Sequence, residues 1–237
     1  SRGLSSPDIN NFYRSYIKNK KKNLPFVTCK IAISKDHFTV HNKKKWITNK
    51  YSRARVHLLR AKHDCLITSS QTIIKDDPNL TCRINGLFKR SPTRIILDKN
   101  LKIPAKSKVL GKKLRKNTII FYNKDNKDKI NLLRKLKIKV YRIALNTDDD
   151  LDLKKVIIRV RKLGFSRIFL ESGIKLTTNF LRADLIDDLK IFMSNTKLGK
   201  NGRGSIKNNF IKFIKNRKFI KENVNLFGEK LISYKMK

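Results

Sequence analysis

Short apolar blocks alternate with amphipathic segments along most of the chain. Residues 26–34 form an apolar block with the length of a buried strand. Residues 50–62 then place Val56, Leu59 and the nearby His63 on one face of a predicted helix. The same alternation predicts further strands over 65–68, 93–97, 118–122, 139–143, 167–170 and 189–193, and further helices over 128–136, 150–162 and 175–183.

Local signals mark where several of these elements begin and end. Asp150 is expected to cap the helix over 150–162, and Gly164 to close it. Residues 76–78 (Asp-Asp-Pro) predict a turn. The polar residues 36–45 are expected to form a loop, and the glycines Gly199, Gly202 and Gly204 a flexible turn.

The order of the predicted elements indicates the fold class. Strands that alternate with helices predict an α/β fold, with a mostly parallel sheet and helices on both faces. Two closely spaced strands, over 219–225 and 231–235, predict an antiparallel edge.

The charge leaves two interpretations open. The chain has 237 residues, with 58 Lys and Arg against 18 Asp and Glu, a net charge of +40. Such a charge indicates a nucleic-acid partner. However, the basic residues are spread along the whole chain, and Lys outnumbers Arg more than twofold, whereas proteins that contact base edges rely on Arg. The alternative explanation of the charge is codon bias combined with a preference for phosphorylated ligands.

The cysteines and the hydropathy pattern favour a cytoplasmic location. Cys29, Cys65 and Cys82 are far apart and form no C-x-x-C pair, as expected in a reducing compartment. No run approaches the roughly 20 apolar residues of a membrane span. The four histidines have no metal-ligand spacing, so no metal site is predicted.

Three features are candidates for chemistry. Glu171-Ser172-Gly173 follows a predicted strand and precedes a helix, which is either a phosphate-binding turn or an ordinary capped connection. Lys30 interrupts an apolar strand, and it either points outward at an edge or serves a site. Arg60 and Arg83 flank the strand over 65–68, where they either clamp a phosphate or are solvated.

Taken in order, several motifs resemble one family. They are residues 25–34 (PFVTCKIAIS), Trp46-Ile47-Thr48, Leu59-Arg60-Ala61, Thr72, Asp76-Asp77-Pro78, Leu80-Thr81, Arg83, residues 92–98 (PTRIILD) and Phe169-Leu170-Glu171-Ser172-Gly173 with Leu176. Together they resemble the reductase domain of the bifunctional riboflavin-biosynthesis deaminase/reductase. The resemblance covers about residues 24–237. It implies a dihydrofolate-reductase-like three-layer α/β fold, a homodimer, and NADPH-dependent reduction of the ribose of 5-amino-6-(5-phosphoribosylamino)uracil to the ribitylamino product.

The resemblance also implies roles for individual residues. Lys30 and Glu171 fall at catalytic positions. Positions that contact NADPH are Ala32, Trp46, Thr72, Asp76, Lys99, Gly173, Ile174, Lys175, Leu176 and Thr177. Positions that contact the substrate are Lys44, Arg60, Leu80, Arg83 and Glu171.

The chain departs from the family pattern on the substrate side. The loop over 36–45 is shorter than usual, Lys44 replaces a frequent Ser, and His37 stands where the family has Gly, so it is expected to need a positive φ.

The partner domain of the family is a zinc deaminase with H-x-E and P-C-x-x-C motifs, and neither motif occurs here. Residues 1–23 are expected to be a linker or remnant that follows such a domain, and 24–237 the reductase domain. A basic nucleic-acid-binding protein, or a related reductase with another pyrimidine or pteridine substrate, remains the alternative.

Overall fold

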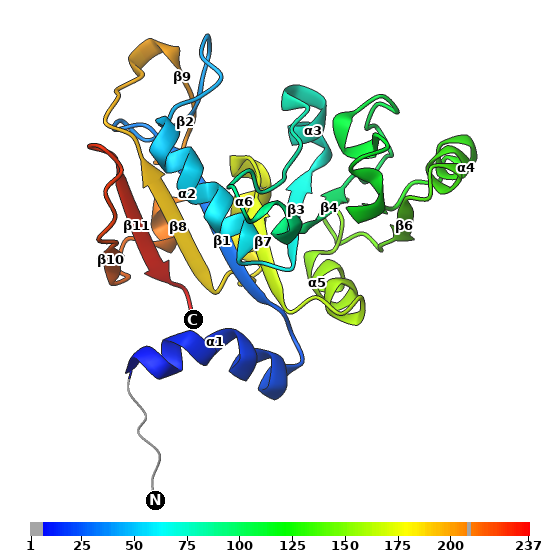
Figure 1. Cartoon of the computed structure of the whole chain (residues 1–237), viewed down its shortest axis with the longest axis horizontal. Coiled ribbons are helices and arrows are strands. Elements are labelled where there is room, and N and C mark those ends of the chain that lie inside the picture. The colour runs from blue at the N-terminus through cyan, green and yellow to red at the C-terminus, as the bar shows by residue number, and fades with distance from the viewer. Residues whose placement is uncertain (1–6, 208–209) are drawn as a thin grey trace, which may run out of the picture.

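A nine-stranded sheet forms the centre of the molecule (Figure 1). The computed structural model describes residues 7–207 and 210–237. The strands, in the order in which they lie side by side, are β10 (Phe219–Lys221), β11 (Lys230–Lys235), β8 (Asp188–Met193), β1 (Phe26–Ile33), β7 (Arg167–Glu171), β3 (Cys65–Ser69), β4 (Thr93–Leu97), β5 (Thr118–Tyr122) and β6 (Lys139–Arg142). The helices are α1 (Pro7–Lys22), α2 (Lys50–Ala61), α3 (Ser70–Asp76), α4 (Lys127–Lys135), α5 (Leu153–Lys162) and α6 (Ile174–Arg182).

The pairing of the strands confirms the predicted α/β class. All neighbours from β8 across to β6 are parallel. At the other side, β11 runs antiparallel to β8 and β10 antiparallel to β11, which is the predicted antiparallel edge. β10 is shorter than the predicted strand over 219–225. Its pairing ends at Lys221, and the next side chain, Glu222, turns to the ammonium of Lys190 on β8.

Each face of the sheet buries its own apolar cluster. Val27, Cys29 and Ile31 of β1 pack with residues of α5 and α6. On the opposite face, Phe169 of β7 packs with residues of α2, α3 and α4. Burial on both faces explains why the central strands are nearly continuous apolar runs in the sequence.

Helix α1 lies near the start of β1, at the amino-terminal ends of the parallel strands (Figure 1). Arg14 donates to Asp188 at 2.7 Å and Lys18 to Asp187 at 2.6 Å, so two ion pairs attach the helix to the sheet. Helix α1 takes up most of residues 1–23, and residues 1–6 lie outside the described part. Among the described residues, no helix is both long and apolar enough to cross a membrane.

The segment over 36–45 is not wholly a loop. Phe38–His41 forms strand β2, which pairs antiparallel with β9 (Gly202–Ser205) in a separate two-stranded sheet. The glycines expected to form a flexible turn therefore belong partly to a strand. A Cβ at Gly202 would lie 2.4 Å from the ring of Phe38, so only glycine allows this close pairing. His37 adopts φ +73°, as expected from the missing glycine.

Two details of the helices differ from the prediction. The N-cap of α5 is Asp152, whose carboxylate accepts from the N–H groups of Lys154 and Lys155, and not Asp150. Three further aspartates, over 148–150, precede Asp152, and each of them has a side chain suited to an N-cap. Which aspartate caps the helix therefore depends only on the residue at which the helix begins. Helix α3 was missed because its seven residues are too short to show an apolar period.

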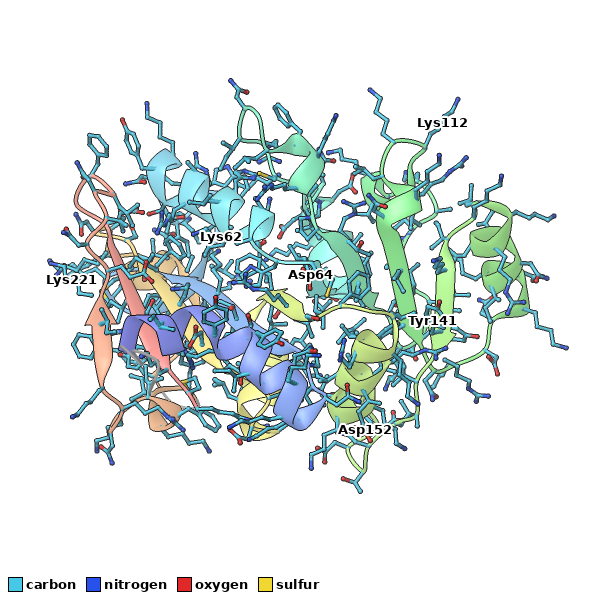
Figure 2. All side chains as sticks on the ribbon, turned by 60° about the horizontal axis from the view of Figure 1, so that its bottom comes forward. Lys62, Asp64, Lys112, Tyr141, Asp152 and Lys221 are labelled. Atoms are coloured by element: carbon cyan, nitrogen blue, oxygen red, sulfur yellow. The ribbon has the colours of Figure 1, made fainter. Side chains whose placement is uncertain are left out.

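Basic side chains project from opposite ends of the molecule. Figure 2 shows Lys112 and Lys221 projecting from opposite ends of the molecule. Both side chains are exposed, as is Lys62 at the end of α2. Exposed lysines therefore occur at both ends of the described part of the structure.

Candidate active site

A large cavity opens at the carboxyl ends of the central parallel strands. Its volume is about 1210 Å³, and it is lined by residues of β1, β7, α2, α3 and α6, together with Thr39 of β2 and Gly204 of β9. Ligands of open α/β sheets bind at this edge, because the loops that follow the strands diverge there. The cavity brings together predicted residues from both halves of the chain.

Lys30 lies on the central strand β1 and lines this cavity. Its neighbours in register are Glu171 on β7 and Lys190 on β8, so it is not an edge lysine that points to solvent. Within the described part of the chain, its ammonium forms no hydrogen bond or ion pair. Burial lowers the pKa of Lys30, the charge of Arg60 adds to this effect, and the nearby Glu171 opposes it. A half-buried amine with a lowered pKa is suited to proton transfer.

Glu171 is held by Arg60 and not by Lys30. The guanidinium of Arg60 donates from Nε and Nη2 to the two carboxylate oxygens of Glu171, at 2.9 and 2.8 Å. Burial by itself raises the pKa of Glu171, but the charge and hydrogen bonds of Arg60 outweigh it and lower the pKa. Glu171 is therefore ionised, and most of the donors of Arg60 are already in use.

The start of helix α2 is fixed from two sides, and this sets the position of Arg60. Asn49 caps the helix by accepting from the N–H groups of Tyr51 and Ser52, each at 2.9 Å. The carboxylate of Glu229, before β11, accepts from the N–H of Asn49 at 2.8 Å. The ring of Tyr51 also stacks on Phe227 at 3.8 Å between centroids.

Most of the residues predicted to contact the cofactor line the cavity: Ala32, Trp46, Thr72, Asp76, Lys99, Gly173, Ile174, Lys175 and Leu176. Gly173 is the N-cap of α6, and a Cβ there would meet no protein atom within 4 Å. The backbone at the start of α6 is therefore open to a ligand, and its N–H groups suit a phosphate.

Two lysines of the cavity lining, Lys99 and Lys175, form ion pairs with the acidic segment over 148–152. Lys99 donates to the carboxylate of Asp149 at 2.9 Å and also to its backbone carbonyl. Lys175 lies 3.9 Å from the carboxylate of Asp150.

Three predicted residues do not line the cavity. Thr177 is fully buried and its hydroxyl contacts Ser172 at 3.2 Å. Leu80 is 3% exposed, has φ +53° and belongs to the apolar core under α2. Lys44 is exposed, and its N–H donates to His41 Nδ1 at 3.0 Å. Of the residues predicted to contact the substrate, Arg60, Arg83 and Glu171 line the cavity.

The sequence prediction missed several residues that line the cavity, and His57 is the most informative. It lies one helical turn before Arg60, and its Nδ1 is 3.0 Å from the carbonyl oxygen of Thr81. The spacing of three residues from Arg60 on a predicted helix was the available signal. Thr48, Arg53 and Lys75 also line the cavity and carried no distinctive pattern.

The described residues contain no group of three or more His, Cys, Asp or Glu side chains placed to hold a metal ion. Cys29, Cys65 and Cys82 are all buried and unpaired with one another. Burial raises the pKa of the Cys29 thiol to about 12, so this group is an inert part of the core.

Comparison with known proteins places the chain in a family. The model of the RibD C-terminal domain matches residues 25–232. The riboflavin biosynthesis protein RibD of Aquifex aeolicus is 30% identical over 195 residues, which cover 81% of this chain and 52% of that protein. The chain thus spans about half the length of the curated relatives it matches.

Solved structures share the fold. The Acinetobacter baumannii RibD structure superposes with a TM-score of 0.79 at 23% identity and covers 95% of this chain and 62% of that one. The riboflavin biosynthesis reductase Rib7 of Saccharomyces has a TM-score of 0.68 at 19% identity, covering 96% of this chain and 99% of that one. The match of the family model over nearly the whole sheet, from β1 into β11, shows that the chain belongs to the RibD C-terminal domain family.

Proposed function

We propose that this chain reduces the ribose of 5-amino-6-(5-phosphoribosylamino)uracil to the ribitylamino product of riboflavin biosynthesis, with NADPH as the reductant. One observation carries the proposal. A half-buried lysine without a hydrogen-bonding partner in the described part of the chain, Lys30, lies in a large cavity beside an ionised carboxylate, Glu171. Membership of the RibD C-terminal domain family supports the same reaction.

The residues of the cavity fit a nicotinamide dinucleotide. The open backbone at Gly173 and the N-terminus of α6 suit a pyrophosphate, and the cavity is large enough for two ligands side by side. The cations Lys75, Lys99 and Lys175 line it as well, and they suit the extra phosphate of NADPH over NADH. When bound, the cofactor supplies a hydride.

The chain's own residues prepare the substrate for that hydride. Lys30 holds a proton close to the reacting end of the ribose, where charge changes as the ring-opened sugar is reduced. Glu171, which Arg60 keeps ionised and oriented, accepts hydrogen bonds from ribose hydroxyl groups. Arg83, which is exposed and lines the cavity, binds the phosphate group. Positioning of this kind supplies a large part of the rate enhancement.

The test is a direct assay with purified protein, NADPH and the ribosylaminouracil phosphate. The absorbance of reduced nicotinamide should fall only when both compounds are present, and the product should carry an open ribityl chain by mass spectrometry. If the protein reduced a different pyrimidine or a pteridine but not the ribosylaminouracil phosphate, the proposed substrate would be wrong. Tight, steeply salt-dependent nucleic-acid binding without cofactor binding would favour the nucleic-acid hypothesis.

We also propose the setting in which the enzyme works. The part of the curated relatives that matches this chain is only about half of their length, which supports a deaminase partner domain, with residues 1–23 as the connection to it. A homodimer agrees with the resemblance to the family. A cytoplasmic location agrees with the three unpaired cysteines. Light scattering of the purified protein tests the dimer.

A further inference from the structure

One ring nitrogen of His57 hydrogen-bonds to the protein, and the other has no hydrogen-bonding partner among the described residues. Its Nδ1 lies 3.0 Å from the carbonyl oxygen of Thr81, and Nη1 of Arg60 donates to the same oxygen at 2.9 Å. Nη1 of Arg60 also lies 3.4 Å from Nδ1, a contact in which Nδ1 would accept. The contact with the carbonyl of Thr81 is shorter, and a carbonyl oxygen only accepts hydrogen bonds, so we assign the hydrogen to Nδ1. In the neutral ring Nε2 is then the acceptor, and it has no protein partner among the described residues. His57 lines the cavity together with Arg60 and Arg83.

The charges around His57 keep its ring neutral in the free protein. Arg60 faces it from its own helix, Arg83 from the segment after α3, and Glu171 from β7. Burial lowers the pKa of His57, both arginines lower it further, and the carbonyl of Thr81 and the charge of Glu171 oppose them without cancelling the effect. Arg60 is paired with Glu171, whereas Arg83 has no ion-pair partner among the described residues.

We propose that His57 is a further substrate-binding residue, whose Nε2 takes up a proton when the phosphate group of the substrate binds beside Arg83 and then donates a hydrogen bond to that phosphate. The inference rests on the proposed function, because it requires a phosphorylated substrate in this part of the cavity. A phosphate dianion more than cancels the charge of Arg83, so the sign of the local potential reverses and the imidazolium becomes the favoured form.

The proton balance gives this inference a distinctive signature. One N–H bond forms at Nε2, the proton comes from the solvent, and no other covalent bond changes. Binding of a phosphate monoester beside an arginine would by itself release protons near pH 6–7, because the ester has a second pKa of about 6 and the arginine favours the dianion. Uptake by His57 has the opposite sign, so the two contributions can be told apart.

The experiment measures proton exchange during binding. Isothermal titration calorimetry of the ribosylaminouracil phosphate, in buffers with different ionisation enthalpies, should show net proton uptake near neutral pH with the wild-type protein. His57→Gln keeps a neutral donor for Thr81 but cannot titrate. It should convert uptake into release or no exchange, and weaken binding roughly tenfold through loss of a charge-assisted hydrogen bond. His41→Gln, which changes a histidine outside the cavity lining, is the matched control and should behave as wild type.

The outcomes separate this inference from the proposed function. Binding of the substrate without proton uptake, or with uptake that persists in His57→Gln, would overturn the role of His57 and leave the proposed function intact. Failure of the wild-type protein to bind the substrate at all would overturn both. In the free protein, long-range ¹H–¹⁵N NMR should show hydrogen on Nδ1 and none on Nε2, and the opposite tautomer would also contradict the inference.

Discussion

Arg60 of α2 binds Glu171 of β7 through two hydrogen bonds of 2.9 and 2.8 Å, across more than a hundred residues of sequence. The side chains are only 10% and 18% exposed. This pair joins the helix over one face of the sheet to the end of a central strand. It leaves Lys30, the neighbour of Glu171 in register, without a hydrogen bond to that carboxylate.

We predict that Lys30→Met lowers kcat by about two orders of magnitude, the usual scale for loss of a proton-transfer group. The affinity for NADPH, measured by fluorescence titration, should stay the same, because the cofactor positions lie mainly along α3 and α6. Glu171→Gln should lower kcat on the same scale. A near-normal kcat for Lys30→Met would remove Lys30 from the chemistry.

Arg60→Ala should destabilise the fold by about 3 kcal/mol, because it leaves the carboxylate of Glu171 buried without its partner. Urea unfolding measures this change. The double variant Arg60→Ala with Glu171→Gln is the control and should recover part of the stability, since no unpaired charge is then left. An unfolding free energy for Arg60→Ala equal to that of the wild type would show that the pair contributes nothing to stability.

Arg83→Ala should act on binding and not on stability. Arg83 is exposed and forms no hydrogen bond or ion pair with another described residue, so its loss disturbs no packing. If it binds the substrate phosphate in both the ground and transition states, KM should rise roughly thirtyfold while kcat changes little. Loss of NADPH binding with an unchanged substrate KM would assign Arg83 to the cofactor instead.

The attachment of β2 to β9 should weaken in acid. Burial opposes ionisation of Asp36, but hydrogen bonds from the Ser34 hydroxyl and from the N–H groups of Gly199 and Leu198 lower its pKa to about 2, against an ordinary value of 3.8. Because the folded pKa is below the unfolded one, Asp36 stabilises the fold fully above about pH 4, and this contribution is lost as the pH falls toward 2.

The comparison with Asp36→Asn tests this dependence. The difference in unfolding free energy between wild type and variant should be largest above pH 4 and shrink toward pH 2. A difference that does not change with pH would show that the charge of Asp36 does not hold the two segments together.

The sequence determined the class of the fold and the residue types of the site. Largely apolar runs such as residues 26–34 specify buried strands, and the intervening amphipathic segments specify helices on both faces, because burial follows periodicity. Strands β4 and β5 begin and end at the predicted residues. The resemblance of the ordered motifs located Lys30, Arg60, Arg83 and Glu171, and all four line one cavity.

Only the tertiary structure decided which of these groups contact one another. The partner of Glu171 is Arg60 and not Lys30, since the two carboxylate oxygens match the fork of a guanidinium that α2 carries to them. The pairing of β2 with β9 likewise depends on a segment distant in sequence. The choice of Asp152 as the N-cap depends on the exact residue at which α5 begins. Periodicity records which face of an element is buried, but it holds no information on which distant side chain meets that face.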